Sequence, residues 1–499
     1  MSRIWKGLFF GAVIFNLILA AWSVLHSDIQ FTSEIARDFF LFNEILQKKF
    51  VLIGPSSTTG LFHGPLWSYI NFPAYLIGKG NPLAVGWFWV LLCVGFLISG
   101  FYIAKNLFDV KTAYFFTLMI SVYGVFIAKG LYNPHGAMFV IPAFFFFFVK
   151  YQQTLKYKYL VAHVLLAGAL VQLQMAIGIP FLILSFAYTV LMAFKRKKRA
   201  HLSAYLFLFA FVANFLLFDL RHSFLISKIT IKFLTSVGRD HVNIISMLYQ
   251  RIRTMTTGIE FLRQDSGYRN LVIFLIGGLY MLFQLKNNRF KNTYFYFLYF
   301  YFGYLLLSML NAGGLLYFYF FPLFPLTFLI FSSFATSRYS KLFLIVFFVI
   351  FALNIRTAIT DTIGDSASFG RVQDSWAFQK SVADKIFAGD EKKFGYFVYS
   401  PDSLAYREKF AMLYVSNKSK KQALYFQKQP ITYIFVAAPP KGNLFMTEGW
   451  WIKNELHIEK TADSEVVFAN GYKIEKFLLS DEEMRVKPEP NIDPGLSFR

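Results

Sequence analysis

Residues 83–104 read LAVGWFWVLLCVGFLISGFYIA and contain no charged side chain. As a helix this run is about 33 Å long, because each residue adds about 1.5 Å, and the hydrocarbon core of a bilayer is about 30 Å thick. Comparable apolar runs recur until about Ile355 and then stop. Only 16% of the 499 residues are charged, and 56% are hydrophobic. The sequence therefore predicts a polytopic α-helical membrane protein.

The apolar runs predict about eleven transmembrane helices. They cover roughly residues 7–25, 83–104, 112–128, 135–149, 159–177, 180–194, 202–219, 270–285, 292–310, 316–334 and 342–355. The first run has the position of a signal peptide, but no convincing small-x-small cleavage site follows it. We interpret it as an uncleaved first span. The runs 180–194 and 342–355 are near or below the lower length limit for a crossing.

The basic residues predict the orientation of these spans. One set of connections carries 17 Lys and Arg residues against a single acid, Asp109. The cations are Arg3, Lys6, Lys105, Lys111, Lys150, Lys156, Lys158, Lys195, Arg196, Lys197, Lys198, Arg199, Lys286, Arg289, Lys291, Arg338 and Lys341. This clustering accounts for +16 of the net charge of +22 and is typical of cytoplasmic loops rather than of a nucleic-acid surface. We expect a multi-pass protein of the plasma or inner membrane, with a cytoplasmic N-terminus and an extracytoplasmic C-terminal part.

This topology divides the chain into a transmembrane domain, 1–355, and an extracytoplasmic α/β domain, 356–486, followed by a disordered tail, 487–499. The domain 1–355 has a first outer loop, 26–82, and a later one, 220–269. Within the first loop, Phe31–Lys49 has the spacing of an amphipathic helix that lies on the membrane surface. The short apolar stretch Pro65–Ile77 suits a second interfacial helix.

The residues that could carry chemistry gather at the expected outer ends of the spans. The sequence has no glycine-rich phosphate loop, no zinc-type Cys/His cluster and no nucleophile elbow. The polar group instead comprises Asp28, Glu34, Arg37, Asp38, Glu44, His63, Asn133, His135, Asp219, Arg221 and His222.

Several of these residues belong to stretches that resemble the family-39-type glycosyltransferases of the GT-C fold. That family includes protein mannosyltransferases and the aminoarabinose transferase of lipid A. The matching stretches are Glu34-Ile-Ala-Arg37-Asp38-Phe with Asn43-Glu44-Ile-Leu46, Leu52 to Gly60, Phe62 to Tyr69, Tyr132-Asn133-Pro134, Phe218 to Phe224 and Phe320 to Pro325. The resemblance covers most of residues 5–356 and implies a GT-C-like catalytic domain of about eleven transmembrane helices.

The resemblance also implies a reaction. A polyprenyl-phosphate sugar would be the donor, a hexose or pentose would be transferred with inversion, and an acid in the first outer loop would take the proton of the acceptor hydroxyl. Glu34 aligns with that acid, although the family usually has aspartate there. Asp38 is the second candidate for the base and Asp28 the third. The alternative is that Glu34 is a solvated acid on a helix face.

The leaving phosphate calls for positive charge. Arg37 is one candidate, although it is equally well placed for an i,i+3 pair with Glu34. His63 stands where aminoarabinose transferases carry a phosphate-contacting lysine. Arg221 and His222 either contact phosphate or anchor the span through Asp219. Tyr317 and Tyr319 either stack on a sugar or belong to the aromatic belt at the membrane interface.

We expect no cofactor and a metal-independent site. Asn133 stands where some relatives have a second acid, and an amide is a poorer ligand than a carboxylate for a hard cation. His135 would replace that acid only partly. The expected partners are a polyprenyl-phosphate sugar, a lipid, glycan or protein acceptor, and membrane lipids, with no nucleic acid.

Two other functions remain open at this point. A transporter of lipid-linked sugars would place ionisable residues at mid-membrane. A polysaccharide polymerase or ligase would concentrate them in a later outer loop, and segment 220–269 carries Arg239, Arg251, Arg253 and Arg263.

Overall fold

The structure is a computed structural model, and it describes residues 3–47, 49–56, 62–236, 243–256, 267–287, 290–310, 317–400, 404–438 and 447–490. The chain forms two compact units. We call them the helical unit, which comprises Met1–Ala20, Val51–Ile70 and Val90–Thr360, and the α/β unit, which comprises Ala21–Phe50, Asn71–Trp89 and Asp361–Arg499. Two segments from the first 90 residues therefore fold together with the C-terminal part of the chain.

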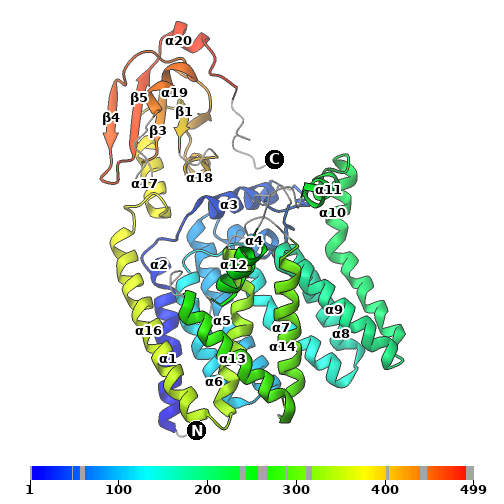
Figure 1. Cartoon of the computed structure of the whole chain (residues 1–499). Coiled ribbons are helices and arrows are strands. Elements are labelled where there is room, and N and C mark those ends of the chain that lie inside the picture. The colour runs from blue at the N-terminus through cyan, green and yellow to red at the C-terminus, as the bar shows by residue number, and fades with distance from the viewer. Residues whose placement is uncertain are drawn as a thin grey trace. The chain divides into compact units, whose positions relative to one another are not determined.

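Most helices of the helical unit are long and apolar (Figure 1). They are α1 (Arg3–Ala20), α5 (Pro82–Leu107, which begins in the α/β unit), α6 (Val110–Ile127), α7 (Asn133–Thr154), α8 (Tyr157–Leu173), α9 (Met175–Lys195), η1 (Arg199–Leu208), α10 (Phe209–Arg221), α11 (Leu225–Ser236), α12 (Ile244–Thr256), α13 (Gly267–Asn287), α14 (Lys291–Ser308), η3 (Tyr317–Leu323), α15 (Phe324–Ser333), η4 (Phe334–Thr336) and α16 (Ser340–Ser368, which ends in the α/β unit).

Eight helical stretches of the described residues are long and apolar enough to cross a membrane. They are Arg3–Ala20, Pro82–Leu107, Val110–Ile127, Asn133–Thr154, Met175–Lys195, Arg199–Arg221, Phe318–Thr336 and Ser340–Ser368. Eight of the eleven expected spans overlap these stretches, and the other three overlap α8, α13 and α14. The chain is a multi-pass helical membrane protein.

The two expected spans of marginal length are longer helices in the structure. The stretch predicted as 180–194 is the helix Met175–Lys195, and the stretch predicted as 342–355 is the helix Ser340–Ser368. The predicted span ends at Ile355, where Arg356 ends the apolar run, yet charged residues are compatible with a helix that continues beyond it.

The core of the helical unit is built largely from aromatic rings. Phe144 and Phe148 on α7 contact Phe300 on α14 at ring-centroid distances of 5.5 and 5.0 Å. Phe181 on α9 contacts the same ring at 5.1 Å. The phenylalanine run 144–148, which the sequence leaves without a chemical role, therefore packs α7 against α9 and α14.

The α/β unit contains a five-stranded mixed sheet (Figure 1). Its strands are β1 (Lys393–Tyr399), β2 (Gln422–Tyr425), β3 (Ile431–Val436), β4 (Ser464–Val467) and β5 (Lys473–Leu478), in the order β2-β1-β3-β5-β4. β1 pairs in parallel with β2 and β3, and the β3–β5 and β4–β5 pairs are antiparallel. The expected C-terminal α/β architecture is therefore present, with β2 and β4 as the edge strands.

The helices that lie wholly in this unit are α2 (Trp22–Leu25), α3 (Ser33–Leu46), α17 (Trp376–Phe387), α18 (Tyr406–Lys418), α19 (Glu448–Asn454) and α20 (Asp481–Arg485). Helix α4 (Leu66–Ile77) is divided between the two units. Side chains alternate along β1, so its two faces have different neighbours. Phe397 packs with Ile452 of α19, whereas Phe394 contacts Phe387 of α17 at 5.2 Å. Helices therefore cover both faces of the sheet.

Helix α3, which was predicted to be amphipathic, packs on protein. In α3, nine of fourteen residues are buried. Phe39 and Phe40 contact Phe410 of α18 at ring-centroid distances of 5.2 and 5.6 Å. The amphipathic pattern of α3 was correct, but its apolar face serves the core of the α/β unit. The pattern alone does not distinguish a lipid surface from a protein partner.

Candidate active site

Helix α3 carries four of the expected site residues, and they differ sharply in burial. Glu34 is in its first turn and exposed, Arg37 is half-buried, and Asp38 and Glu44 are buried. Among the described residues Glu34 makes no hydrogen bond or ion pair, so the expected alternative, an i,i+3 pair between Glu34 and Arg37, does not form. Arg37 turns to Asp38 instead.

Asp38 has an unusual electrostatic environment. Arg37 donates from Nη2 and Nε to one oxygen, Oδ1, at 3.2 and 3.4 Å. Its other oxygen, Oδ2, is buried without a hydrogen-bond partner among the described residues. Burial raises the pKa of Asp38 to about 6, against the lowering effect of Arg37, and the nearby charge of Glu34 raises it further. Asp38 is therefore a carboxyl group that titrates near neutral pH.

Asp28 is committed to hydrogen bonds within the α/β unit. Oδ1 accepts from the backbone amides of Ile29 at 2.8 Å and Ala377 at 3.0 Å. Oδ2 accepts from Ser375 Oγ at 2.5 Å and from the amide of Gly370 at 3.3 Å. The residue is buried, and it joins the chain before α3 to the first turn of α17. This bonding gives Asp28 a structural role, so the proposal below does not use it as a base.

His63 lies in the part of the first loop that belongs to the helical unit. Its carbonyl accepts from the amide of Gly54 at 2.7 Å, and its amide donates to the carbonyl of Pro55 at 2.9 Å. The next residue, Gly64, donates from its amide to the carbonyl of Gln172 at 2.9 Å. A Cβ added at Gly64 would lie 1.8 Å from Gln172 Oε1 and 2.9 Å from its Cα. The contact with α8 therefore fixes the backbone beside His63.

Two amide side chains that the sequence analysis did not single out hold this loop. Gln172 Nε2 donates to Asn214 Oδ1 at 2.8 Å, and Asn214 Nδ2 donates to the carbonyl of Leu52 at 2.7 Å. These residues come from α8 and α10, so the loop is tied to two helices. The available signal was a polar amide within an otherwise apolar helix, which is costly unless it is hydrogen-bonded.

Asn133 and His135 begin α7 within the helical unit. Asn133 is buried, and its Nδ2 donates to the carbonyl of Leu173 at the end of α8 at 2.9 Å. The ring of His135 is buried between Tyr132 at 4.7 Å and Phe321 at 5.3 Å, and its Nδ1 accepts from the amide of Tyr132 at 3.3 Å. Both side chains therefore have packing and bonding roles at the α7 terminus.

Asp219 caps a helix instead of anchoring Arg221 or His222. Its oxygens accept from the amides of Ile226 at 2.7 Å and Ser227 at 3.3 Å, and from Ser227 Oγ at 2.5 Å, at the start of α11. Arg221 and His222 are exposed. The His222 ring stacks on Phe218 with centroids 3.9 Å apart. The exposed Arg221 guanidinium and His222 ring remain available to a ligand.

The remaining expected residues give a mixed result. Tyr319 is buried in η3 and contacts Phe318 edge-on at 4.8 Å, so it is a packing residue rather than an exposed belt aromatic. Tyr317 begins η3, and its side chain lies outside the described part of the structure. Among the described residues no group of three His, Cys, Asp or Glu side chains is arranged to hold a metal ion.

The expected residues fall into two sets. Asp28, Glu34, Arg37 and Asp38 belong to the α/β unit, and His63, Asn133, His135, Arg221 and His222 belong to the helical unit. Each set is held by local contacts within its own unit.

Comparison of the whole fold with solved structures identifies its type. ArnT from Cupriavidus metallidurans bound to undecaprenyl phosphate matches with a TM-score of 0.60 at 11% identity, covering 96% of this chain and 99% of that one. The chain has a GT-C fold. The apo structure of the same ArnT matches with a TM-score of 0.56 at 11% identity, covering 95% and 97%. No protein-family model and no curated protein matches the sequence. The GT-C fold predicted from the sequence is thus confirmed by structure alone.

Proposed function

We propose that this protein is an integral-membrane glycosyltransferase that moves a sugar from a polyprenyl-phosphate donor to an acceptor hydroxyl on the extracytoplasmic side. One observation carries the proposal: α3 presents an exposed carboxylate, Glu34, one turn before the ion pair between half-buried Arg37 and buried Asp38. The GT-C fold supports it, because the matching ArnT was solved with undecaprenyl phosphate bound. The charge pattern supports a cytoplasmic N-terminus and an extracytoplasmic α/β unit.

Glu34 is the proposed general base. A base must reach the proton that it removes, and Glu34 is exposed whereas Asp38 is only 3% exposed. In the transfer step the acceptor oxygen attacks the anomeric carbon while Glu34 takes the hydroxyl proton. The bond from that carbon to the phosphate oxygen breaks, and its electron pair leaves with the polyprenyl phosphate. This single displacement inverts the anomeric centre.

Asp38 is the proposed positioning residue for Arg37. Its Oδ1 accepts both guanidinium bonds, which restricts the direction of a cation one turn from Glu34. Asp38 therefore acts through the position of Arg37, without touching the acceptor.

Phosphate contact is proposed separately for groups in each unit. On α3, Arg37 is the cation one turn after the proposed base. In the helical unit, His63 is held on a loop that α8 and α10 fix in place. Arg221 and His222 are exposed at the end of α10. We propose that phosphate recognition uses these groups and needs no metal ion.

The polymerase or ligase alternative rests on segment 220–269. There Arg251 is buried in α12 and Arg253 is exposed, while Arg239 and Arg263 lie outside the described residues. Burial of Arg251 removes one of its cations from direct contact with a soluble glycan. The α3 site is therefore the better supported centre.

The test of the proposed class is donor consumption by the purified full chain in detergent. Polyprenyl-phosphate hexoses and pentoses are offered in parallel with nucleotide sugars, and free polyprenyl phosphate is measured with and without a chelator. The proposal predicts release of polyprenyl phosphate from at least one lipid donor, unaffected by the chelator. Transfer from a nucleotide sugar, or from a preformed glycan on a polyprenyl diphosphate, would overturn it.

A further inference from the structure

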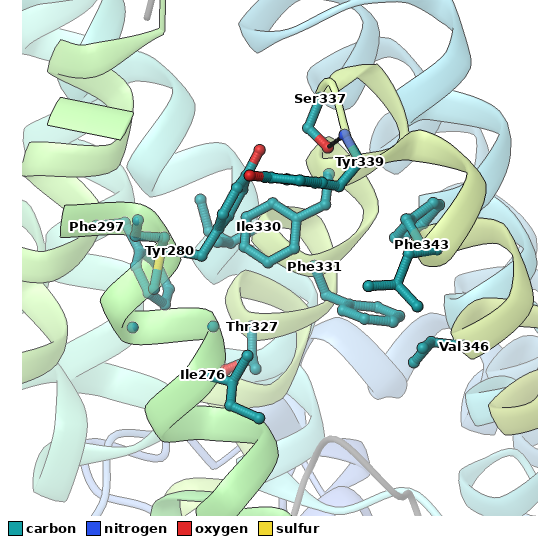
Figure 2. Close-up of a pocket in the computed structure, with 15 residues that line it drawn as sticks. Ile276, Tyr280, Phe297, Thr327, Ile330, Phe331, Ser337, Tyr339, Phe343 and Val346 are labelled. Atoms are coloured by element: carbon teal, nitrogen blue, oxygen red, sulfur yellow. Dashed lines mark hydrogen bonds between the residues drawn. The ribbon is translucent and has the colours of Figure 1, made fainter. Parts of the chain in front are cut away.

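A cavity lies within the helical unit, where α13, α15 and α16 meet. The cavity has a volume of about 460 Å³, which is in the range of small-molecule pockets. Figure 2 shows it bounded by Ile276 and Tyr280 of α13, Phe331 of α15 and Phe343 of α16. Its walls are almost entirely hydrocarbon and aromatic side chains, so the chemistry that fits it is an apolar chain.

The cavity has a closed floor and an open rim. Met281, Phe297 and Ile330 are buried on its inner side. Ile276 and Leu342, by contrast, are 62% and 61% exposed. Both exposed residues lie on apolar helices, so the rim faces the lipid environment of the membrane. An apolar chain can enter from that side without crossing water.

One end of the cavity is polar. Figure 2 shows the rings of Tyr280 and Tyr339 next to each other there, with centroids 6.0 Å apart. The hydroxyl of Tyr280 is buried without a hydrogen-bond partner among the described residues. The guanidinium of Arg338 lies 4.7 Å from the Tyr339 ring centroid and 5.7 Å from that of Phe283. An unused donor and a cation therefore stand at the same end of an apolar cavity.

No Asp or Glu occurs in the interval between Asp265 and Asp361, which supplies α13, α15 and most of α16. The same interval carries Arg269, Lys286, Arg289, Lys291, Arg338, Lys341 and Arg356. Arg338 and Lys341 are exposed in the connection from α15 to α16 and at the start of α16. Positive charge at a membrane surface attracts anionic lipid headgroups.

We propose that this cavity binds one anionic glycerophospholipid from the leaflet that borders the Arg338 end. One acyl chain fills the apolar cavity, and the phosphate contacts Arg338 while Tyr280 donates a hydrogen bond to an ester or phosphate oxygen. The site goes beyond the proposed transfer reaction, because it involves neither α3 nor the loop that holds His63. The lipid joins α13 to α15 and α16.

The test uses the full chain in mild detergent with phosphatidylglycerol, phosphatidylcholine and polyprenyl phosphate as probes. Native mass spectrometry measures binding of each, and thermal shift measures the rise in Tm. Gly278→Leu fills the cavity, because a Cβ at Gly278 meets no described atom within 4 Å and leucine favours a helix more than glycine does. Arg338→Gln removes the cation. Folding of each variant is checked by size exclusion.

Matched controls separate the site from general effects. Gly95→Leu introduces the same side chain on α5, where a Cβ also meets no described atom. Arg199→Gln removes another exposed arginine that lies over an aromatic ring, 4.6 Å from the centroid of Phe194. Neither residue lines the cavity. Both controls are expected to bind phosphatidylglycerol as the wild type does.

The proposal predicts that phosphatidylglycerol binds the wild type and raises its Tm, and that Gly278→Leu abolishes both effects. Arg338→Gln is expected to weaken binding roughly tenfold, the loss typical of one charge-assisted contact. Equal binding of phosphatidylcholine would contradict the anionic headgroup. Displacement of phosphatidylglycerol by polyprenyl phosphate would assign the cavity to the donor. Unchanged binding of phosphatidylglycerol by Gly278→Leu would show that the lipid does not bind in this cavity.

Discussion

Arg37 Nη2 lies 3.2 Å from Asp38 Oδ1 on helix α3. The other carboxylate oxygen of Asp38, Oδ2, is buried without a hydrogen-bond partner among the described residues. Burial outweighs the attraction of the arginine and raises the pKa of Asp38 to about 6. At neutral pH the protein therefore keeps a buried carboxylate ionised beside the proposed base. Such a group costs stability, which is typical of a residue retained for function.

Asp38→Asn tests this cost. The pKa of Asp38 is higher in the folded chain, about 6, than its ordinary value of 3.8, so folding favours the protonated form. The wild type should then lose stability as pH rises from about 4 to about 7, by up to about 3 kcal/mol at about 1.4 kcal/mol per pKa unit. Asparagine does not titrate. The Tm difference between variant and wild type should grow in the variant's favour over this range, and a constant difference would contradict the shift.

Asp28→Ala should destabilise the α/β unit. It leaves Ser375 Oγ and three backbone amides without their buried acceptor, which costs about 2–4 kcal/mol. Asp384→Ala is the control, because Asp384 forms only a half-exposed pair with Lys380 and its loss should cost less than about 1 kcal/mol. Thermal unfolding and limited proteolysis distinguish the two. Full stability with loss of turnover in Asp28→Ala would instead indicate a catalytic role.

Gly64→Ala should impair turnover only by moving the backbone beside His63, because it changes no group proposed to act in the reaction. The added Cβ collides with Gln172, so the backbone beside His63 must shift, and a shift of about 1 Å near a reacting group can cost about 100-fold in rate. Gly95→Ala adds the same methyl group where a Cβ meets no described atom within 4 Å and should leave turnover unchanged. The turnover of His63→Gln is measured in parallel and compared with that of Gly64→Ala. Wild-type turnover in Gly64→Ala would show that this loop position is unimportant.

Asp219→Ala should lower stability by about 1 kcal/mol, the usual cost of a lost helix cap, because the amides of Ile226 and Ser227 lose their acceptor. Asp219→Asn keeps an acceptor oxygen and should lose less. Turnover measured on folded protein should fall by less than about tenfold in both. A loss of about 100-fold or more in the folded asparagine variant would mean that the charge itself acts in the reaction.

Much of the fold could be predicted because it follows from local pattern. Apolar length identifies spans such as 83–104, and the end of the apolar runs near Ile355 separates the C-terminal α/β part. Individual strands are harder to predict: β2, Gln422–Tyr425, is only four residues long and has no alternating pattern. The packing of α3 on α18 could not be predicted, because the contacting residue Phe410 is far along the chain.

The site could be predicted only as a set of residues. Charge and position in the sequence single out Glu34, Arg37 and Asp38. They do not show that Asp38 is the buried carboxylate, because burial depends on tertiary contacts. The partner of Asp28 is Ser375, 347 positions away, and no local signal reveals that bond. Gln172 and Asn214 were missed for the same reason, as their roles appear only when α8 and α10 meet the first loop.

The most direct test of the central claim is turnover of a polyprenyl-phosphate sugar by wild type and by Glu34→Gln in parallel. The amide keeps the size and polarity of the side chain and removes the base, so turnover should fall by about 100- to 10,000-fold while Tm and donor binding persist. Glu482→Gln, which changes another exposed acid in the first turn of a helix, is the control and should behave as the wild type. Wild-type turnover in Glu34→Gln would contradict the account and place the base elsewhere.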